Sequence, residues 1–260
     1  MKYNNKKYND FLRAYCNWEK LESIFLSFDI DWAPDFILKD LRNLLDETNA
    51  SFMVTHDSQY TRELENIFSV GTHPNLRKGS SQGDDIFECI DFYKSNNLSR
   101  FTINRFHVLG FAYPDVVALS QEGLKLDSSS LFLNHHFITP HYQEEIDVIS
   151  APYFWEDGMR LNNRTSYDDS FIDFECPGLK IFDFHPIDIF LNTFSIEQRN
   201  EFKNSFDSVN DATEDEAKKF VNSKIHGTRD ILKELIQMKN LGKFKIYDLD
   251  FLNDRFRELL

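Results

Sequence analysis

Two carboxylates and two imidazoles stand directly after apolar segments of the chain. Asp29 and Asp31 follow one such segment, His73 lies in a Gly-Thr-His-Pro sequence, and His185 follows another segment and precedes a proline. A catalytic zinc ion typically takes three carboxylate or imidazole ligands and keeps one position open for water or substrate. Asp31 and His73 are therefore candidate metal ligands, and the third ligand must come from elsewhere in the chain.

Asp29 and His185 have the side chains needed for proton transfer. Asp29 is two residues from Asp31 along an extended segment, so both carboxylates would face the same side, with Asp29 free to accept a proton from water. The imidazole of His185 suits a general acid. Taken singly, these patterns also fit an ordinary loop or a structural histidine, and their meaning depends on the elements that position them.

The apolar periodicity predicts a series of strand and helix units. Strand patterns cover residues 24–31, 50–55, 69–71, 101–109, 124–126 and 179–184, and helical patterns cover 34–45, 61–68, 84–94 and 114–122. Strands that alternate with helices form parallel sheets, and this number of units favours a barrel over a small open sheet. We expect one domain with a core at about 22–194, followed by a mostly helical C-terminal part, 195–260, that contains a late strand at 244–247.

Composition and charge narrow the classes of partner. The 260 residues include 43 acidic and 29 basic side chains, for a formal charge of -14, which opposes binding to nucleic acid and to anionic membrane surfaces. No segment approaches the length of a membrane span. The three cysteines are far apart in sequence, which predicts neither a disulfide framework nor a zinc ribbon. Because the first two dozen residues are polar and charged, we expect a cytoplasmic location.

The order of these motifs resembles the polysaccharide deacetylase family, carbohydrate esterase family four. Residues 27–31 (Ser-Phe-Asp-Ile-Asp) look like the first family motif, 71–73 (Gly-Thr-His) like the second, and 179–185 (Leu-Lys-Ile-Phe-Asp-Phe-His) like the late histidine motif. The closest resemblance is to the WbmS-like branch, through residues 28–35, 54–58, 73–75, 152–157 and 184–192. The resemblance covers most of the chain.

This resemblance implies a fold and an activity. The fold would be a distorted, seven-stranded (β/α) barrel, and the activity the metal-dependent removal of an N-acetyl group from an amino sugar or surface-polysaccharide precursor. The first motif makes Asp29 the catalytic base and Asp31 a metal ligand, the second makes His73 a ligand, and the third makes His185 the acid that protonates the leaving amine. The cofactor would be a divalent metal, most simply Zn2+.

Two positions depart from the family pattern. The second motif normally has another histidine four residues after the first, but Arg77 stands there. We consider His107 as the replacement ligand, with His56 in reserve. The family also has an arginine before Pro-Tyr that orients the catalytic aspartate, whereas this chain has Ala151, and Arg105 is our candidate to replace it.

The segment after Ala151 supplies the expected substrate contacts. Tyr153 and Trp155 would stack on the sugar ring, and Glu156 or Asp157 would bind its hydroxyl groups. The Tyr153 backbone N–H would help the metal to hold the oxyanion that develops during hydrolysis.

Other functions fit some of the same residues. A haloacid-dehalogenase-type phosphatase also starts with Asp-x-Asp, but it leaves both histidines unexplained and expects Thr or Val where Ala33 stands. Arg77 and Ala151 favour a non-catalytic protein that binds a sugar or a partner enzyme. A deformylase for formylated amino sugars is a close variant of the deacetylase.

Overall fold

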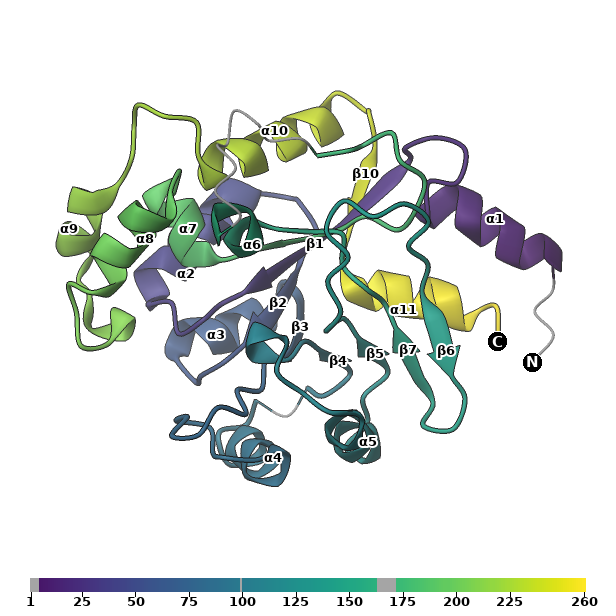
Figure 1. Cartoon of the computed structure of the whole chain (residues 1–260), viewed down its shortest axis with the longest axis horizontal. Coiled ribbons are helices and arrows are strands. Elements are labelled where there is room, and N and C mark those ends of the chain that lie inside the picture. The colour runs from purple at the N-terminus through teal and green to yellow at the C-terminus, as the bar shows by residue number, and fades with distance from the viewer. Residues whose placement is uncertain (1–4, 99, 163–171) are drawn as a thin grey trace.

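The computed structural model describes residues 5–98, 100–162 and 172–260. Within these residues, ten strands form a single curved sheet (Figure 1). The strands are β1 (Ser23–Asp29), β2 (Ser51–Val54), β3 (Ser69–Thr72), β4 (Ile103–Asn104), β5 (Leu126–Asp127), β6 (His141–Gln143), β7 (Val148–Ser150), β8 (Trp155–Glu156), β9 (Ile181–Phe184) and β10 (Lys245–Tyr247).

The strand order is β6-β7-β5-β4-β3-β2-β1-β9-β8, with β10 beside β1. All of these pairs are parallel except β6 with β7. The path ends at β6 and β8, so the sheet is not fully closed. The predicted distorted barrel is confirmed. The sheet has ten strands where seven were expected, because the short strands β6, β7 and β8 join those at the predicted positions.

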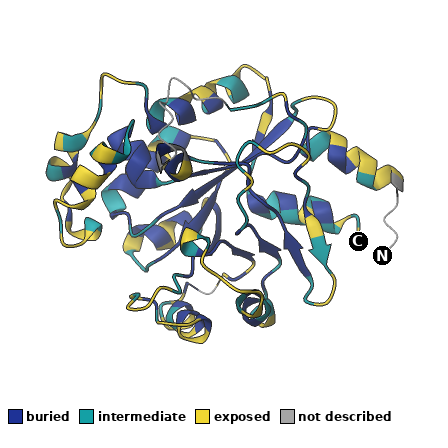
Figure 2. Ribbon diagram, in the orientation of Figure 1, coloured by how far each residue is buried: buried dark blue, intermediate teal, exposed yellow. Residues whose placement is uncertain are grey.

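Helices surround this sheet, and their apolar faces supply the rest of the core. The α-helices are α1 (Asn5–Tyr15), α2 (Asp35–Leu45), α3 (Gln59–Leu64), α4 (Ile86–Ser95), α5 (Tyr113–Gln121), α6 (Asp157–Asn162), α7 (Pro186–Leu191), α8 (Ile196–Lys203), α9 (Glu214–Ala217), α10 (Thr228–Asn240) and α11 (Leu249–Arg257). Figure 2 shows buried residues along the strands and exposed residues on the outer helix faces. In the described residues, no helix is long and apolar enough to cross a membrane.

The C-terminal part is joined to the core through both a strand and a helix. Strand β10 pairs with the first half of β1, whose second half pairs with β2. Helix α11 lies beside α1, where the Phe11 and Phe256 rings meet edge to face at 5.4 Å (Figure 1). Residues 195–260 are mostly helical, as expected. Their strand β10 joins the sheet by pairing with β1.

The segment predicted as a strand at 101–109 is extended only at Ile103–Asn104. After Asn104 the chain leaves the sheet and forms a short 3-10 turn, His107–Leu109, in which Val108 and Leu109 have positive φ angles of 50° and 55°. A branched residue such as valine rarely adopts this conformation, which indicates that tertiary contacts fix the turn. The early end of the strand determines where His107 points.

Candidate active site

The predicted chemical residues gather where parallel strands end. Asp29 is the last residue of β1, His73 follows β3, and His185 follows β9. Carboxyl ends of neighbouring parallel strands share one edge of a sheet, which is where α/β proteins place their sites. Beyond β1 the chain turns sharply, because Asp31 and Trp32 have φ angles of 44° and 56°. Such strained backbone at a strand end is typical of functional sites.

Asp31, His73 and His107 bring three ligand atoms together. The Oδ1 atom of Asp31 lies 3.0 Å from Nδ1 of His107 and 3.4 Å from Nε2 of His73. The two imidazole nitrogens are 3.2 Å apart. The histidines and carboxylate therefore converge on one point, as three ligands of a divalent metal do.

The hydrogen bonding of this cluster fits a cation. Nδ1 of His73 lies 2.7 Å from the carbonyl oxygen of Arg105, which can only accept, so in the neutral ring Nδ1 carries the hydrogen and Nε2 presents a lone pair. Within the described residues, Oδ1 of Asp31 is buried without a hydrogen-bond partner. Burial opposes ionisation of Asp31, but the rings of His107 and His73 more than offset it and hold its pKa well below the usual range. An ionised Asp31 oxygen and the Nε2 lone pair of neutral His73 are donors of the kind that zinc binds.

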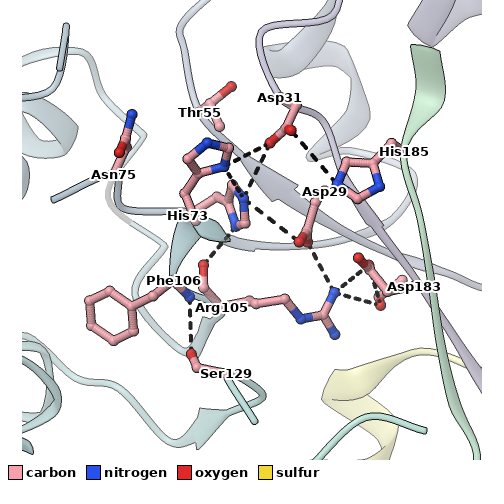
Figure 3. Close-up of polar contacts among 12 residues, drawn as sticks. Asp29, Asp31, Thr55, His73, Asn75, Arg105, Phe106, Ser129, Asp183 and His185 are labelled. Atoms are coloured by element: carbon pink, nitrogen blue, oxygen red, sulfur yellow. Dashed lines mark hydrogen bonds and ion pairs between the residues drawn. The ribbon is translucent and has the colours of Figure 1, made fainter. Parts of the chain in front are cut away.

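Arg105 holds the predicted base. Its Nη1 atom donates to Oδ1 of Asp29 at 3.0 Å and also to a carboxylate oxygen of Asp183, and Figure 3 shows the guanidinium reaching both groups. Arg105 and Asp183 are fully buried, and Asp29 is 5% exposed. Burial raises the pKa of Asp183 well above its usual range in spite of the nearby Arg105. Arg105 therefore stands where the expected orienting arginine would act.

Asp183 is a site residue that the sequence interpretation did not assign. Its Oδ1 also accepts a hydrogen bond from Ser27 Oγ at 2.9 Å, and its Oδ2 is buried without a partner in the described residues. The period of two along β9 is the signal that could have revealed it, because Asp183 lies two residues before His185 and so faces the same side.

Asp157 orients His185. Its Oδ1 lies 2.6 Å from Nδ1 of His185, and its Oδ2 accepts the His185 backbone N–H at 2.9 Å. Burial alone would lower the pKa of His185, but the Asp157 carboxylate, assisted by Asp31 and Glu156, holds it well above its usual range. The Nε2 atom remains directed toward the cluster, 3.7 Å from Oδ2 of Asp31. Asp157 therefore fixes the His185 ring with Nε2 directed toward the cluster.

The structure corrects several predicted substrate contacts. Trp155 is fully buried against Phe182 and Phe184, so it offers no face to a sugar. Asp157 is buried and occupied by His185, which leaves it unable to bind sugar hydroxyls. These roles were wrong because burial depends on how β8 packs against β9, which the local sequence does not reveal.

Tyr153 is also committed to other contacts. Its ring is 1% exposed and lies under the Arg105 guanidinium, 4.4 Å from carbon to centroid. Its hydroxyl donates to Glu156 at 2.9 Å, and its backbone N–H donates to the Ser130 carbonyl at 2.8 Å. Stacking on a sugar and donation to an oxyanion are therefore both excluded in this arrangement. Glu156 is half-buried at the edge of the cluster.

The structure shows where Arg77 and the two candidate replacement ligands, His107 and His56, lie. Arg77 is exposed on the loop after His73, where its backbone N–H donates to Asn75 at 3.1 Å. His107 instead supplies the second imidazole of the cluster. His56, the reserve candidate, is paired with Thr55 Oγ1 at 3.1 Å and is not part of the three-residue cluster.

The comparisons with known proteins identify the family of this chain. The sequence profile of WbmS-like polysaccharide deacetylases matches residues 26–203, a range that spans Asp29 to His185. The chain belongs to the WbmS-like polysaccharide deacetylase family. This confirms the resemblance that the three sequence motifs indicate.

Solved structures of polysaccharide deacetylases share the fold. WbmS of Bordetella bronchiseptica, assigned as a polysaccharide deacetylase involved in O-antigen biosynthesis, matches with a TM-score of 0.71 and 24% identity over 82% of this chain and 89% of that one. A protein from Mycobacterium smegmatis assigned to the same class matches with a TM-score of 0.51 and 12% identity over 95% of each chain. No curated protein sequence matches the chain. The predicted deacetylase barrel is therefore confirmed.

Proposed function

We propose that this polysaccharide deacetylase is a metal-dependent hydrolase that removes an N-acetyl group from an amino sugar of a surface-polysaccharide precursor. The observation that carries the proposal is the convergence of Asp31, His73 and His107 beside a carboxylate and an imidazole that are each held by a buried partner. Metal ligands, a base (Asp29) and an acid (His185) therefore lie together at the carboxyl ends of the strands. Amide hydrolysis needs all three.

Asp31, His73 and His107 would hold the metal. One carboxylate and two imidazoles are a common ligand set of catalytic zinc. When bound, the ion supplies a Lewis acid for the amide carbonyl and makes water more acidic.

Asp29 and His185 divide the proton transfers between them. The Asp29 carboxylate, fixed by Arg105, accepts a proton from the attacking water. His185 has its Nδ1 occupied by Asp157, so Nε2 is the atom that donates a proton to the departing nitrogen. Donation at this stage lets the sugar leave as a free amine together with acetate.

Trp32 is our candidate for the sugar platform in place of the buried Trp155. It directly follows Asp31, is half-buried, and meets the His107 ring edge-on with centroids 5.4 Å apart. Its backbone N–H donates to Thr55 Oγ1 at 3.0 Å, which fixes the turn that presents it. An aromatic ring beside the ligand cluster suits the apolar face of a pyranose.

The structure supports catalysis over a purely binding role. Arg77 and Ala151 favoured a non-catalytic protein because they replace a ligand and an orienting arginine. His107 brings an imidazole to Asp31 and His73, and Arg105 pairs with Asp29, so the site contains both kinds of group. The involvement of the Bordetella WbmS protein in O-antigen biosynthesis supports a surface-polysaccharide precursor as the substrate.

The function is tested by product analysis on zinc-loaded protein. The parent is incubated with free, nucleotide-linked and lipid-linked N-acetylhexosamines, and acetate, formate and free amine are quantified. We expect equal amounts of acetate and amine, and loss of both in Asp29→Asn, which keeps its zinc. Asp46→Asn, an exposed carboxylate outside the cluster, serves as the matched control. Unchanged acetate release by Asp29→Asn would contradict the mechanism, and formate release would identify a deformylase.

A further inference from the structure

A second set of metal-ligand side chains lies outside the active site. His136, on the segment before β6, meets Asp173 and Cys176, on the segment before β9. One ligand atom from each residue lies within 4.8 Å of the other two. Neither the proposed deacetylation nor its residues make use of this cluster.

The two segments are joined by backbone hydrogen bonds. The Phe137 N–H donates to the Pro177 carbonyl at 2.7 Å, and the Leu179 N–H donates to the Ile138 carbonyl at 2.7 Å. These bonds fix the positions of both segments without any contribution from the cluster. The three side chains therefore meet on a framework that is already formed, which reduces the cost of ordering a site.

The ligand atoms are oriented by their own neighbours. Oδ1 of Asp173 accepts the backbone N–H groups of Glu175 and Cys176 at 3.1 and 3.0 Å, which leaves Oδ2 facing Nε2 of His136 at 3.3 Å. The Cys176 sulfur is held by Lys180, whose Nζ donates to it at 3.1 Å and to the Cys176 carbonyl at 2.5 Å. Hydrogen bonds of this kind orient ligands in metal sites.

We propose that His136, Asp173 and Cys176 bind a zinc ion that clamps these two segments together. Tetrahedral zinc with bonds of about 2.0–2.3 Å places its ligand atoms about 3.3–3.8 Å apart, close to the 3.3 Å between His136 and Asp173. Sulfur, nitrogen and oxygen ligands together suit a borderline ion such as Zn2+ and disfavour Mg2+ and Ca2+. The His136 side chain is 56% exposed, which leaves the ion a path of entry and a position for water.

The active site and this clamp have different chemistry, so one experiment separates them. The ligands Asp31, His73 and His107 contain no sulfur, whereas the clamp has a thiolate. Cobalt(II) bound to a thiolate gives a near-ultraviolet charge-transfer band that oxygen and nitrogen ligands do not give. The full chain is stripped of metal, titrated with Co2+ and followed by absorption spectroscopy, with bound zinc counted in parallel after dialysis.

We expect the parent to show the thiolate band and to bind about two zinc ions per chain. Cys176→Ser should abolish the band, and His136→Ala should at least strongly weaken it. Each of these two variants should also lose one zinc ion. His73→Ala should keep the band. The matched controls His135→Ala and Cys89→Ser should behave as the parent.

Two results would overturn the clamp. One is a parent without the band, which would leave His136 and Asp173 as an ordinary ion pair. The other is a band that survives Cys176→Ser. Because His136 is exposed, its variant should fold even if the cysteine variant does not. Neither result depends on deacetylase activity, so failure of the clamp leaves the proposed function standing.

Discussion

The ring nitrogens Nε2 of His73 and Nδ1 of His107 face each other at 3.2 Å although 34 residues separate them in the chain. His73 follows β3 and His107 follows β4, which are neighbours in the sheet. The second imidazole of the cluster therefore comes from the adjacent strand and not from the loop after His73. This relationship explains how the chain assembles a ligand set with arginine at position 77.

Asp157→Asn should lower kcat by about 10²–10⁴-fold with little change in KM, since an amide cannot hold the His185 imidazolium that donates the proton. Asp91→Asn, an exposed carboxylate on α4, is the control. Steady-state kinetics with the identified substrate measure both constants. A variant that loses affinity for substrate at unchanged kcat would instead indicate that Asp157 binds the sugar.

Trp32→Ala should raise KM about tenfold while zinc binding is retained, because loss of an aromatic contact costs about 1 kcal/mol or more. Trp32→Phe should recover most of the affinity. If Trp32→Ala lowers kcat alone, the indole positions His107 and does not contact the sugar.

Arg105→Met should destabilise the protein by about 3–5 kcal/mol, because it leaves Asp29 and Asp183 buried without their cation. Asp183→Asn should cost less, because burial already favours the neutral form of this carboxyl group. Urea unfolding measures both changes, and Arg77→Met, at an exposed position, should stay within about 0.5 kcal/mol of the parent. Equal stability of Arg105→Met and the parent would contradict the importance of this ion pair.

Much of the fold and part of the site follow from local sequence. The apolar runs that become β1, β3 and β9 end at Asp29, His73 and His185, so their common edge was predictable from strand periodicity. His107 was correctly placed near the cluster even though its strand was expected to be longer.

The remaining site contacts depend on packing between distant segments. Nothing in the local sequence distinguishes a surface Trp155 from one packed on Phe182, or an Asp157 facing solvent from one bound to His185. The strand count was underestimated for a related reason. The unpredicted strands β6, β7 and β8 have only two or three residues each and carry little periodicity. The late strand β10 was expected, but its pairing with β1 joins residues more than 200 positions apart.

Arg257→Ala should reduce stability by about 1–2 kcal/mol at neutral pH. Arg257 donates to the Asp147 carboxylate and carbonyl, both at 2.8 Å, which ties α11 to the β6-β7 hairpin. Arg257 and Lys125 lower the pKa of Asp147. The carboxylate contribution is therefore present above the unfolded pKa of about 3.9 and is lost as the pH falls below it.

Urea unfolding at neutral and acidic pH tests this dependence. The difference between parent and Arg257→Ala should shrink progressively as the pH falls below about 3.9, because protonation of Asp147 removes the carboxylate contribution and leaves the bonds to backbone carbonyls. Arg13→Ala, which removes an exposed ion pair with Glu19, should change stability little at either pH. A difference that grows on acidification would contradict the role of Asp147.

The most direct test of the account is the zinc content of the Cys176→Ser protein, in which the proposed clamp makes no contribution. After dialysis we expect about one zinc ion per chain in this protein, and about none when His107→Ala is added. Loss of a ligand should lower zinc affinity by more than the roughly 10–100-fold that loss of an outer-shell partner costs. Addition of His56→Ala or Arg77→Ala should leave the zinc content unchanged. Zinc that persists without His107, or a parent that binds none, would contradict a metal centre formed by Asp31, His73 and His107.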